Sequence, residues 1–79
     1  MNLKLLDTVA LQADLVGLDL KAGDVGTVVE VLNAESVEVE FVNEVGETVA
    51  LVTLNPSSLR RPTKPELSRW PAGKPARIR

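Results

Sequence analysis

Residues 37–42 read Val-Glu-Val-Glu-Phe-Val, and this nearly strict alternation of apolar and charged side chains constrains the fold more than any other feature of the chain. Successive side chains of a β-strand point to opposite faces, so the segment is predicted to be a strand with one buried face and one face of glutamates. With 79 residues, the chain has room for one hydrophobic core and no second. A small fold built around a single core is therefore expected.

The segments on either side supply four more short strands. Apolar and β-branched residues gather in short runs, and turn-forming residues separate the central runs at 33–36 and 43–47. The expected strands are residues 8–11, 27–32, 37–42, 48–54 and 59–61. This order predicts an all-β chain folded over residues 1–61 as a small SH3-like five-stranded barrel.

Two irregular connections complete the predicted barrel. The long loop at 12–24 contains spaced leucines that are expected to turn inward, and Pro56 presets one 3₁₀ turn at 55–58. The stretch Gly-Asp-Val-Gly at 23–26 leads into the second strand. No Lys-Ser/Thr pair or helix start follows it, so we interpret it as a turn with positive φ and not as a phosphate-binding loop.

The phase of each strand predicts which side chains form the core. If Val39 and Phe41 point inward, Val29 and Val31 pack opposite them. A third wall is expected from Ala50, Val52 and Leu54. Such a core is small, and a domain of about 60 residues buries only about 60% of its unfolded surface, so we expect modest stability.

The outward face of the same strands carries three glutamates, Glu30, Glu38 and Glu40. In any hairpin register Glu30 lies across from one of the other two, and like charges directly opposite each other are unfavourable. Three interpretations remain open. The face is a solvated surface that keeps the protein soluble, a surface that binds arginine side chains, or a site for a hard cation such as calcium or magnesium.

Charge divides the chain into an acidic body and a basic tail. Residues 1–59 hold two cations and ten carboxylates, a balance of −8, whereas residues 60–79 hold seven cations and one carboxylate, a balance of +6. From Pro62 the composition is rich in proline and shows no periodicity, so residues 62–79 are predicted to be an extended basic tail.

The tail contains the single tryptophan of the chain, Trp70, between Arg69 and Pro71. Trp and Arg dominate the energetics of protein interfaces, which makes this segment a candidate anchor. Three outcomes remain open: a disordered tail, a tail folded onto its own or a second copy's acidic barrel, and a tail that captures another protein.

Composition excludes several kinds of chemistry. The chain has no His, Cys or Tyr, which removes the usual ligands of zinc and haem, disulfides, and any histidine acid or base. No base neighbours Ser57 or Ser58 in a recognisable catalytic arrangement, so we expect no enzyme and no cofactor. No apolar run approaches the roughly 18 residues of a membrane span, and a cytoplasmic location is the expectation.

Several blocks of the sequence resemble a known family. These are Leu-Leu-Asp-Thr-Val-Ala-Leu at 5–11, Leu-Lys-Ala-Gly-Asp-Val-Gly-Thr-Val-Val-Glu-Val at 20–31, the alternating segment at 37–42, and Ala-Leu-Val-Thr-Leu at 50–54. Over residues 3–61 they resemble short uncharacterised bacterial proteins, common in cyanobacteria, that carry a domain of unknown function. The resemblance implies an SH3-like barrel. It also implies a protein partner in a two-gene module, as in a toxin–antitoxin pair.

Together these features predict a non-catalytic protein-binding module. Its acidic face and its tail would dock on a partner protein or on a second copy, through Arg60, Arg61, Arg69, Trp70 and the three glutamates. The antidote role rests on the resemblance alone. The alternative is an SH3-like module that associates with RNA or DNA through its basic tail. It is weakened by the acidic barrel, which lacks aromatic residues for base stacking.

Overall fold

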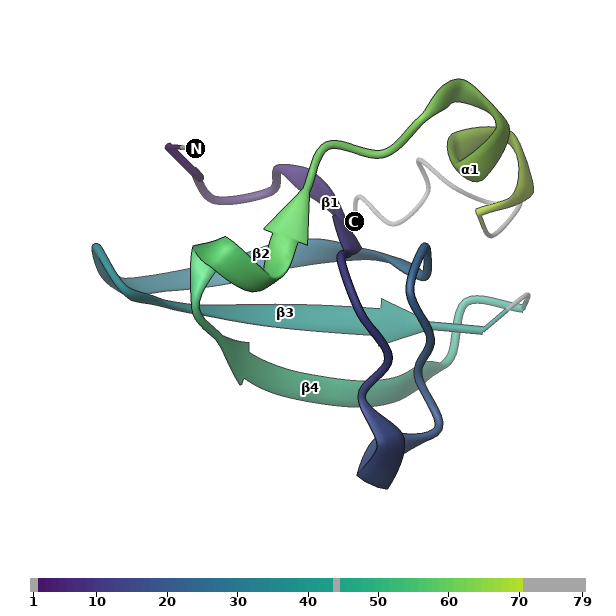
Figure 1. The fold of residues 1–79 in the computed structure, drawn as a ribbon, viewed down its shortest axis with the longest axis horizontal. Coiled ribbons are helices and arrows are strands. Elements are labelled where there is room, and N and C mark those ends of the chain that lie inside the picture. Colours follow the sequence, from purple (N-terminus) through teal and green to yellow (C-terminus); the bar gives the residue numbers. More distant parts are fainter. Residues whose placement is uncertain (1, 44, 71–79) are drawn as a thin grey trace.

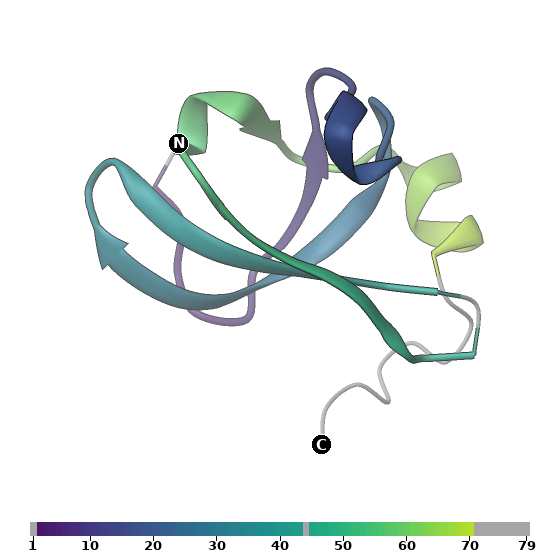
Figure 2. The same cartoon turned by 90° about the horizontal axis from the view of Figure 1, so that it is seen from below.

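The computed structural model describes residues 2–43 and 45–70, whose arrangement is shown in Figure 1. The strands are β1 (Thr8–Leu11), β2 (Val25–Asn33), β3 (Ser36–Val42), β4 (Thr48–Leu54) and β5 (Leu59–Arg60). All neighbouring strands pair antiparallel in the order β4-β3-β2-β1-β5, and the sheet curls into a half-barrel (Figure 2). The predicted all-β, five-stranded SH3-like architecture is therefore confirmed.

The core lies on the concave side of this sheet, with β3 at its centre. Burial alternates along β3, where Val37, Val39 and Phe41 are at most 2% exposed and the residues between them are partly exposed. The other buried members of the cluster are Val9, Leu11, Leu20, Val28 and Leu59. Ala50, Val52 and Leu54 pack against the cluster from β4, which confirms the predicted third wall.

A β-bulge in β2 changes the predicted phase of that strand. Val28 pairs with Val39, but the next pair joins Glu30 to Glu38, so Val29 is an extra residue in β2. The prediction that Val29 packs opposite Val39 is therefore wrong, because Val28 occupies that place and is fully buried. After the bulge, Val31 pairs with Val37 near the hairpin end and stays 44% exposed.

The connections largely follow the sequence pattern. Gly23 has a φ of +92°, as expected for the turn before β2. The 3₁₀ turn η2 (Pro56–Ser58) begins where Asn55 caps it, its side chain accepting a hydrogen bond from the Ser57 N–H. In the loop before β2, Leu20 turns inward as predicted, whereas Leu18 stays 49% exposed at the end of the 3₁₀ turn η1 (Val16–Leu18).

The chain after Pro62 differs from the predicted extended tail. Lys64–Arg69 form a short helix, α1, because Thr63 and Glu66 make a reciprocal capping box at its start. Pro65 is tolerated there, since the first-turn N–H groups of a helix have no partner within the helix. The rest of the predicted tail, residues 71–79, lies outside the described residues. No helix among residues 2–43 and 45–70 is long and apolar enough to cross a membrane.

Candidate functional site

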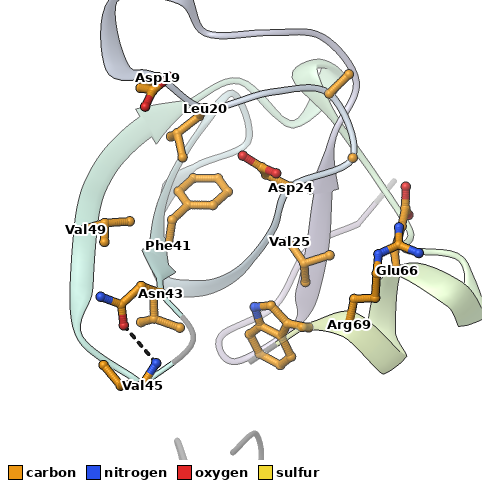
Figure 3. A pocket seen from close by; sticks show the side chains of 14 residues that line it. Asp19, Leu20, Asp24, Val25, Phe41, Asn43, Val45, Val49, Glu66 and Arg69 are labelled. Carbon is orange, nitrogen blue, oxygen red and sulfur yellow. Dashed lines mark hydrogen bonds between the residues drawn. The ribbon is translucent and has the colours of Figure 1, made fainter. Parts of the chain in front are cut away.

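A pocket of about 680 Å³ lies where three separate segments meet (Figure 3). They are the loop 19–25, the end of β3 with the following hairpin, and the end of α1. Its apolar part comprises Leu20, Val25, Phe41, Val42, Val45, Val49 and Trp70. Its ionisable side chains are Asp19, Asp24, Glu66 and Arg69. The volume lies within the range of small-ligand pockets, which makes this the first candidate for a binding site.

The helix side of the pocket is held by one ion pair. The Arg60 guanidinium donates two hydrogen bonds to the Glu66 carboxylate, of 2.8 and 2.7 Å, in the two-pronged geometry that is strongest for this pair. The Glu66 side chain is only 13% exposed and also accepts the Thr63 N–H at 2.9 Å. Because Arg60 belongs to β5, these bonds attach α1 to the barrel.

This contact has an electrostatic consequence for both groups. The hydrogen bonds from Arg60, followed by that from the Thr63 N–H, lower the pKa of Glu66 from its ordinary 4.5 to about 2. The same pair raises the pKa of Arg60. Glu66 is therefore ionised at neutral pH, where its carboxylate accepts both hydrogen bonds from Arg60.

The loop side of the pocket is shaped by backbone hydrogen bonds and a close approach. Asp24 accepts the Lys21 N–H at 2.9 Å, and Asp14 accepts the Ala22 N–H at 2.9 Å. A Cβ on Gly23 would lie 3.1 Å from Oε2 of Glu66, so the glycine lets the loop and the capping carboxylate come together. Asp19 adopts the left-handed conformation with a φ of 58°. Asp tolerates this conformation better than most residues.

The hairpin side of the pocket is built around Asn43. Its Oδ1 accepts the N–H groups of Val45 and Glu47, each at 3.0 Å, and its Nδ2 donates to the Glu47 side chain at 3.1 Å. These bonds close the turn and hold Val45 and Val49 at the pocket (Figure 3), where they are 77% and 55% exposed. Apolar side chains that stay this exposed beside a pocket are typical of a contact surface.

The structure separates the predicted site residues into two groups. Arg69 and Trp70 line the pocket, and Arg60 supports it through Glu66. Arg61 is exposed next to Arg60. Trp70 therefore lies beside the barrel of its own chain, and its contact with a partner stays a prediction.

The three glutamates lie on the outer face of the sheet, away from the hydrophobic core. Glu30 and Glu38 are directly paired across β2 and β3, as the sequence analysis expected. The Thr53 hydroxyl donates to Glu38 at 3.5 Å, and the Thr48 hydroxyl donates to Glu40. No cluster of three or more His, Cys, Asp or Glu able to hold a metal ion exists among residues 2–43 and 45–70, so the cation interpretation gains no support.

Sequence reasoning missed most of the polar side of the pocket. The sequence does not point to Asp19, Asn43 or Glu66, and it marks Asp24 only as part of a turn, because these residues come from segments that only the folded sheet brings together. One signal was available for the helix side. The Thr63-x-x-Glu66 spacing is typical of a capping box, and it predicts a helix start in a segment where the prolines argued for extended chain.

Comparison with known proteins gives a family without an assigned activity. Residues 5–61 match the family model described as domain of unknown function (DUF4926), which covers all five strands and stops before α1. The chain therefore belongs to this family, and the resemblance seen in the sequence is confirmed. No curated protein and no solved structure matches the chain.

Proposed function

We propose that this member of the DUF4926 family is a non-catalytic protein-binding domain that holds a basic segment of a partner protein in the pocket beside Trp70. The observation that supports the proposal is the composition of the pocket. Apolar side chains from the loop, β3, β4 and the end of α1 line the pocket together with the carboxylates of Asp19, Asp24 and Glu66. A partner side chain with an apolar body and a cationic end matches both parts.

Charge favours a basic partner over an acidic one. Of the ionisable groups at the pocket, Glu66 is already matched by Arg60. Asp19 and Asp24 lie on the other side of the pocket and outnumber Arg69, the one cation that lines it among residues 2–43 and 45–70. The balance of −8 over residues 1–59 would also attract a cationic partner and speed its association.

Trp70 is the residue expected to contribute most to affinity. It is partly buried at the end of α1 and presents a large apolar surface to the pocket. Truncation of a tryptophan at the centre of an interface costs about 2 kcal/mol or more, which is about thirtyfold in Kd. Asp19→Asn removes one pocket charge and keeps a side chain that tolerates the left-handed backbone, so it tests charge without altering the loop.

The test begins with a random peptide library displayed on phage and selected on the immobilised full chain. Selected peptides are expected to carry Lys or Arg beside a large apolar residue. Their Kd, measured by fluorescence anisotropy, should rise about thirtyfold or more for Trp70→Ala and several-fold for Asp19→Asn. Glu35→Gln, in the exposed turn between β2 and β3, is the matched control and should leave Kd unchanged.

Two results would overturn the proposal. One is enrichment of peptides that bind the wild type and Trp70→Ala equally. The other is enrichment of peptides that lack basic residues and bind wild type and Asp19→Asn with the same Kd. The antidote role implied by the family resemblance is a narrower form of the same proposal, in which the partner is a toxin encoded beside this chain.

Association with RNA or DNA is the competing proposal, and it has less support. Arg60 is occupied by Glu66, and Arg69 lies at a pocket flanked by carboxylates. Nucleic-acid binding would appear as a mobility shift of single- or double-stranded probes at low salt, with affinity that falls steeply as salt rises. Peptide binding that persists at 150 mM salt without any such shift favours the protein partner.

A further inference from the structure

The pocket beside Trp70 is also the place from which residues 71–79 continue. Helix α1 ends at Trp70, whose side chain lines the pocket and whose backbone is extended, with a φ of −71° and a ψ of 148°. Lys74, the first cation after it, follows four residues later. Four residues of extended chain span up to about 13 Å, which exceeds the width of about 11 Å of a sphere of 680 Å³. The segment is therefore long enough to cross the pocket.

The composition of this segment matches the lining of the pocket. Residues 71–79 read Pro-Ala-Gly-Lys-Pro-Ala-Arg-Ile-Arg, with three cations and no acidic side chain. Ile78 stands between Arg77 and Arg79, so one short stretch offers an apolar side chain and two guanidinium groups. Apolar side chains and carboxylates line the pocket together, and both kinds find a counterpart in this stretch.

The pocket also has carboxylates and apolar surface that its own walls leave uncovered. In the part of the chain that the structure describes, Glu66 is engaged in an ion pair, whereas Asp19 and Asp24 form none (Figure 3). At the hairpin, Val45 and Val49 are 77% and 55% exposed. A basic segment with an aliphatic residue would neutralise the two aspartates and cover the two valines.

We infer that residues 71–79 occupy this pocket in the same chain and compete there with the partner segment. The inference rests on the proposed function and adds a means of regulating the site. Attachment at Trp70 favours the same chain over a second copy, because a short tether gives an effective concentration in the millimolar range. A partner must displace the segment, so its apparent Kd is raised by the fraction of pockets that are already filled.

The test uses the full chain with the cations of the segment neutralised and its length unchanged. This segment variant carries Lys74→Gln, Arg77→Gln and Arg79→Gln. The matched control lowers the net charge equally through three exposed cations that do not line the pocket. It carries Lys4→Gln, Arg61→Gln and Lys64→Gln. The selected basic peptides should bind the segment variant at least about fivefold more tightly than the control.

Amide spectra show the occupancy without any added peptide. Between the control and the segment variant, shifts should differ in the loop 19–25 and in the hairpin around Asn43, which are two sides of the pocket. Glu35, in the exposed turn between β2 and β3, should not shift. Because the contact lies within one chain, the differences should be the same from about 50 µM to 1 mM protein.

Asp19→Asn tests whether the segment and the peptide use the same charge. Removal of this carboxylate weakens both binders, so less competition is left for the segment variant to relieve. In the Asp19→Asn background the gain in peptide affinity should therefore fall below the fivefold seen without it. An undiminished gain would contradict a shared site.

The inference fails if the segment variant and the control have the same peptide Kd and the same amide shifts at the pocket. It also fails if the shift differences grow with protein concentration while the sedimenting mass rises, because the occupant would then be the segment of a second copy. Both failures leave the proposed function intact, since peptide binding is judged by its loss in Trp70→Ala. Pocket shifts without any peptide that depends on Trp70 would overturn the proposed partner and retain the contact of residues 71–79.

Discussion

Gly26 is the residue whose lack of a side chain matters most to the core. It lies in β2 between Val9 of β1 and Phe41 of β3. A Cβ at this position would come within 2.7 Å of a Val39 methyl, 2.8 Å of the Glu40 carbonyl oxygen and 2.9 Å of the Phe41 ring. One of these neighbours is backbone, so the clash cannot be relieved by side-chain rotation alone.

Gly26→Ala is therefore expected to destabilise the protein by about 1–3 kcal/mol, the usual cost of overpacking a core. Urea unfolding followed by Trp70 fluorescence or circular dichroism measures the change. Gly17→Ala is the control, since nothing lies within 4 Å of a Cβ there and φ is not positive. It should be neutral or stabilising by up to about 1 kcal/mol. Equal stability of the two variants would contradict the packing argument.

Strands and turns differ in how far the sequence predicts them. The strand β3 can be predicted from its own residues alone, because their alternation with a period of two indicates both a strand and which face is buried. The bulge at Val29 is different. A run of three β-branched residues, Thr27, Val28 and Val29, fits either phase, and only the pairing with β3 decides between them. The pocket could not be predicted at all, since its three sides are far apart in sequence.

Helix α1 is the element whose attachment should depend on pH. The pKa of Glu66 in the folded protein, about 2, is below its ordinary 4.5. A group with a depressed folded pKa stabilises the fold fully above its ordinary value, and that contribution is lost as pH falls toward the folded value. The link between α1 and β5 should therefore weaken between about pH 4.5 and pH 2.

An acid titration followed by Trp70 fluorescence tests whether α1 detaches from β5. Trp70 is the only tryptophan of the chain and lies at the end of α1, so its fluorescence reports on this helix. Wild type should show a transition in that window that precedes loss of the β-sheet signal. Glu66→Gln should already resemble the acid form at neutral pH and show little change. Glu35→Gln, in an exposed turn, should titrate like wild type. A wild-type profile in Glu66→Gln would show that the ion pair does not hold the helix.

At the scale of the whole molecule, fold and site draw on different parts of the chain. In the part of the chain that the structure describes, every buried hydrophobic residue lies between Val9 and Leu59, within the family match at 5–61. Helix α1 contributes no buried residue, yet it brings Glu66, Arg69 and Trp70 to the pocket. The barrel should therefore be the folding unit, and α1 the part that completes its binding site.

A chain that ends at Arg61 separates the two roles. The five strands and the whole core remain, so the amide spectrum of residues 8–60 should stay dispersed, with shifts confined to Arg60, the Gly23 turn and the hairpin around Asn43. Loss of one side of the pocket should abolish binding of the selected peptides. Collapse of the spectrum would show instead that the Arg60–Glu66 link is required for folding, and that α1 belongs to the barrel itself.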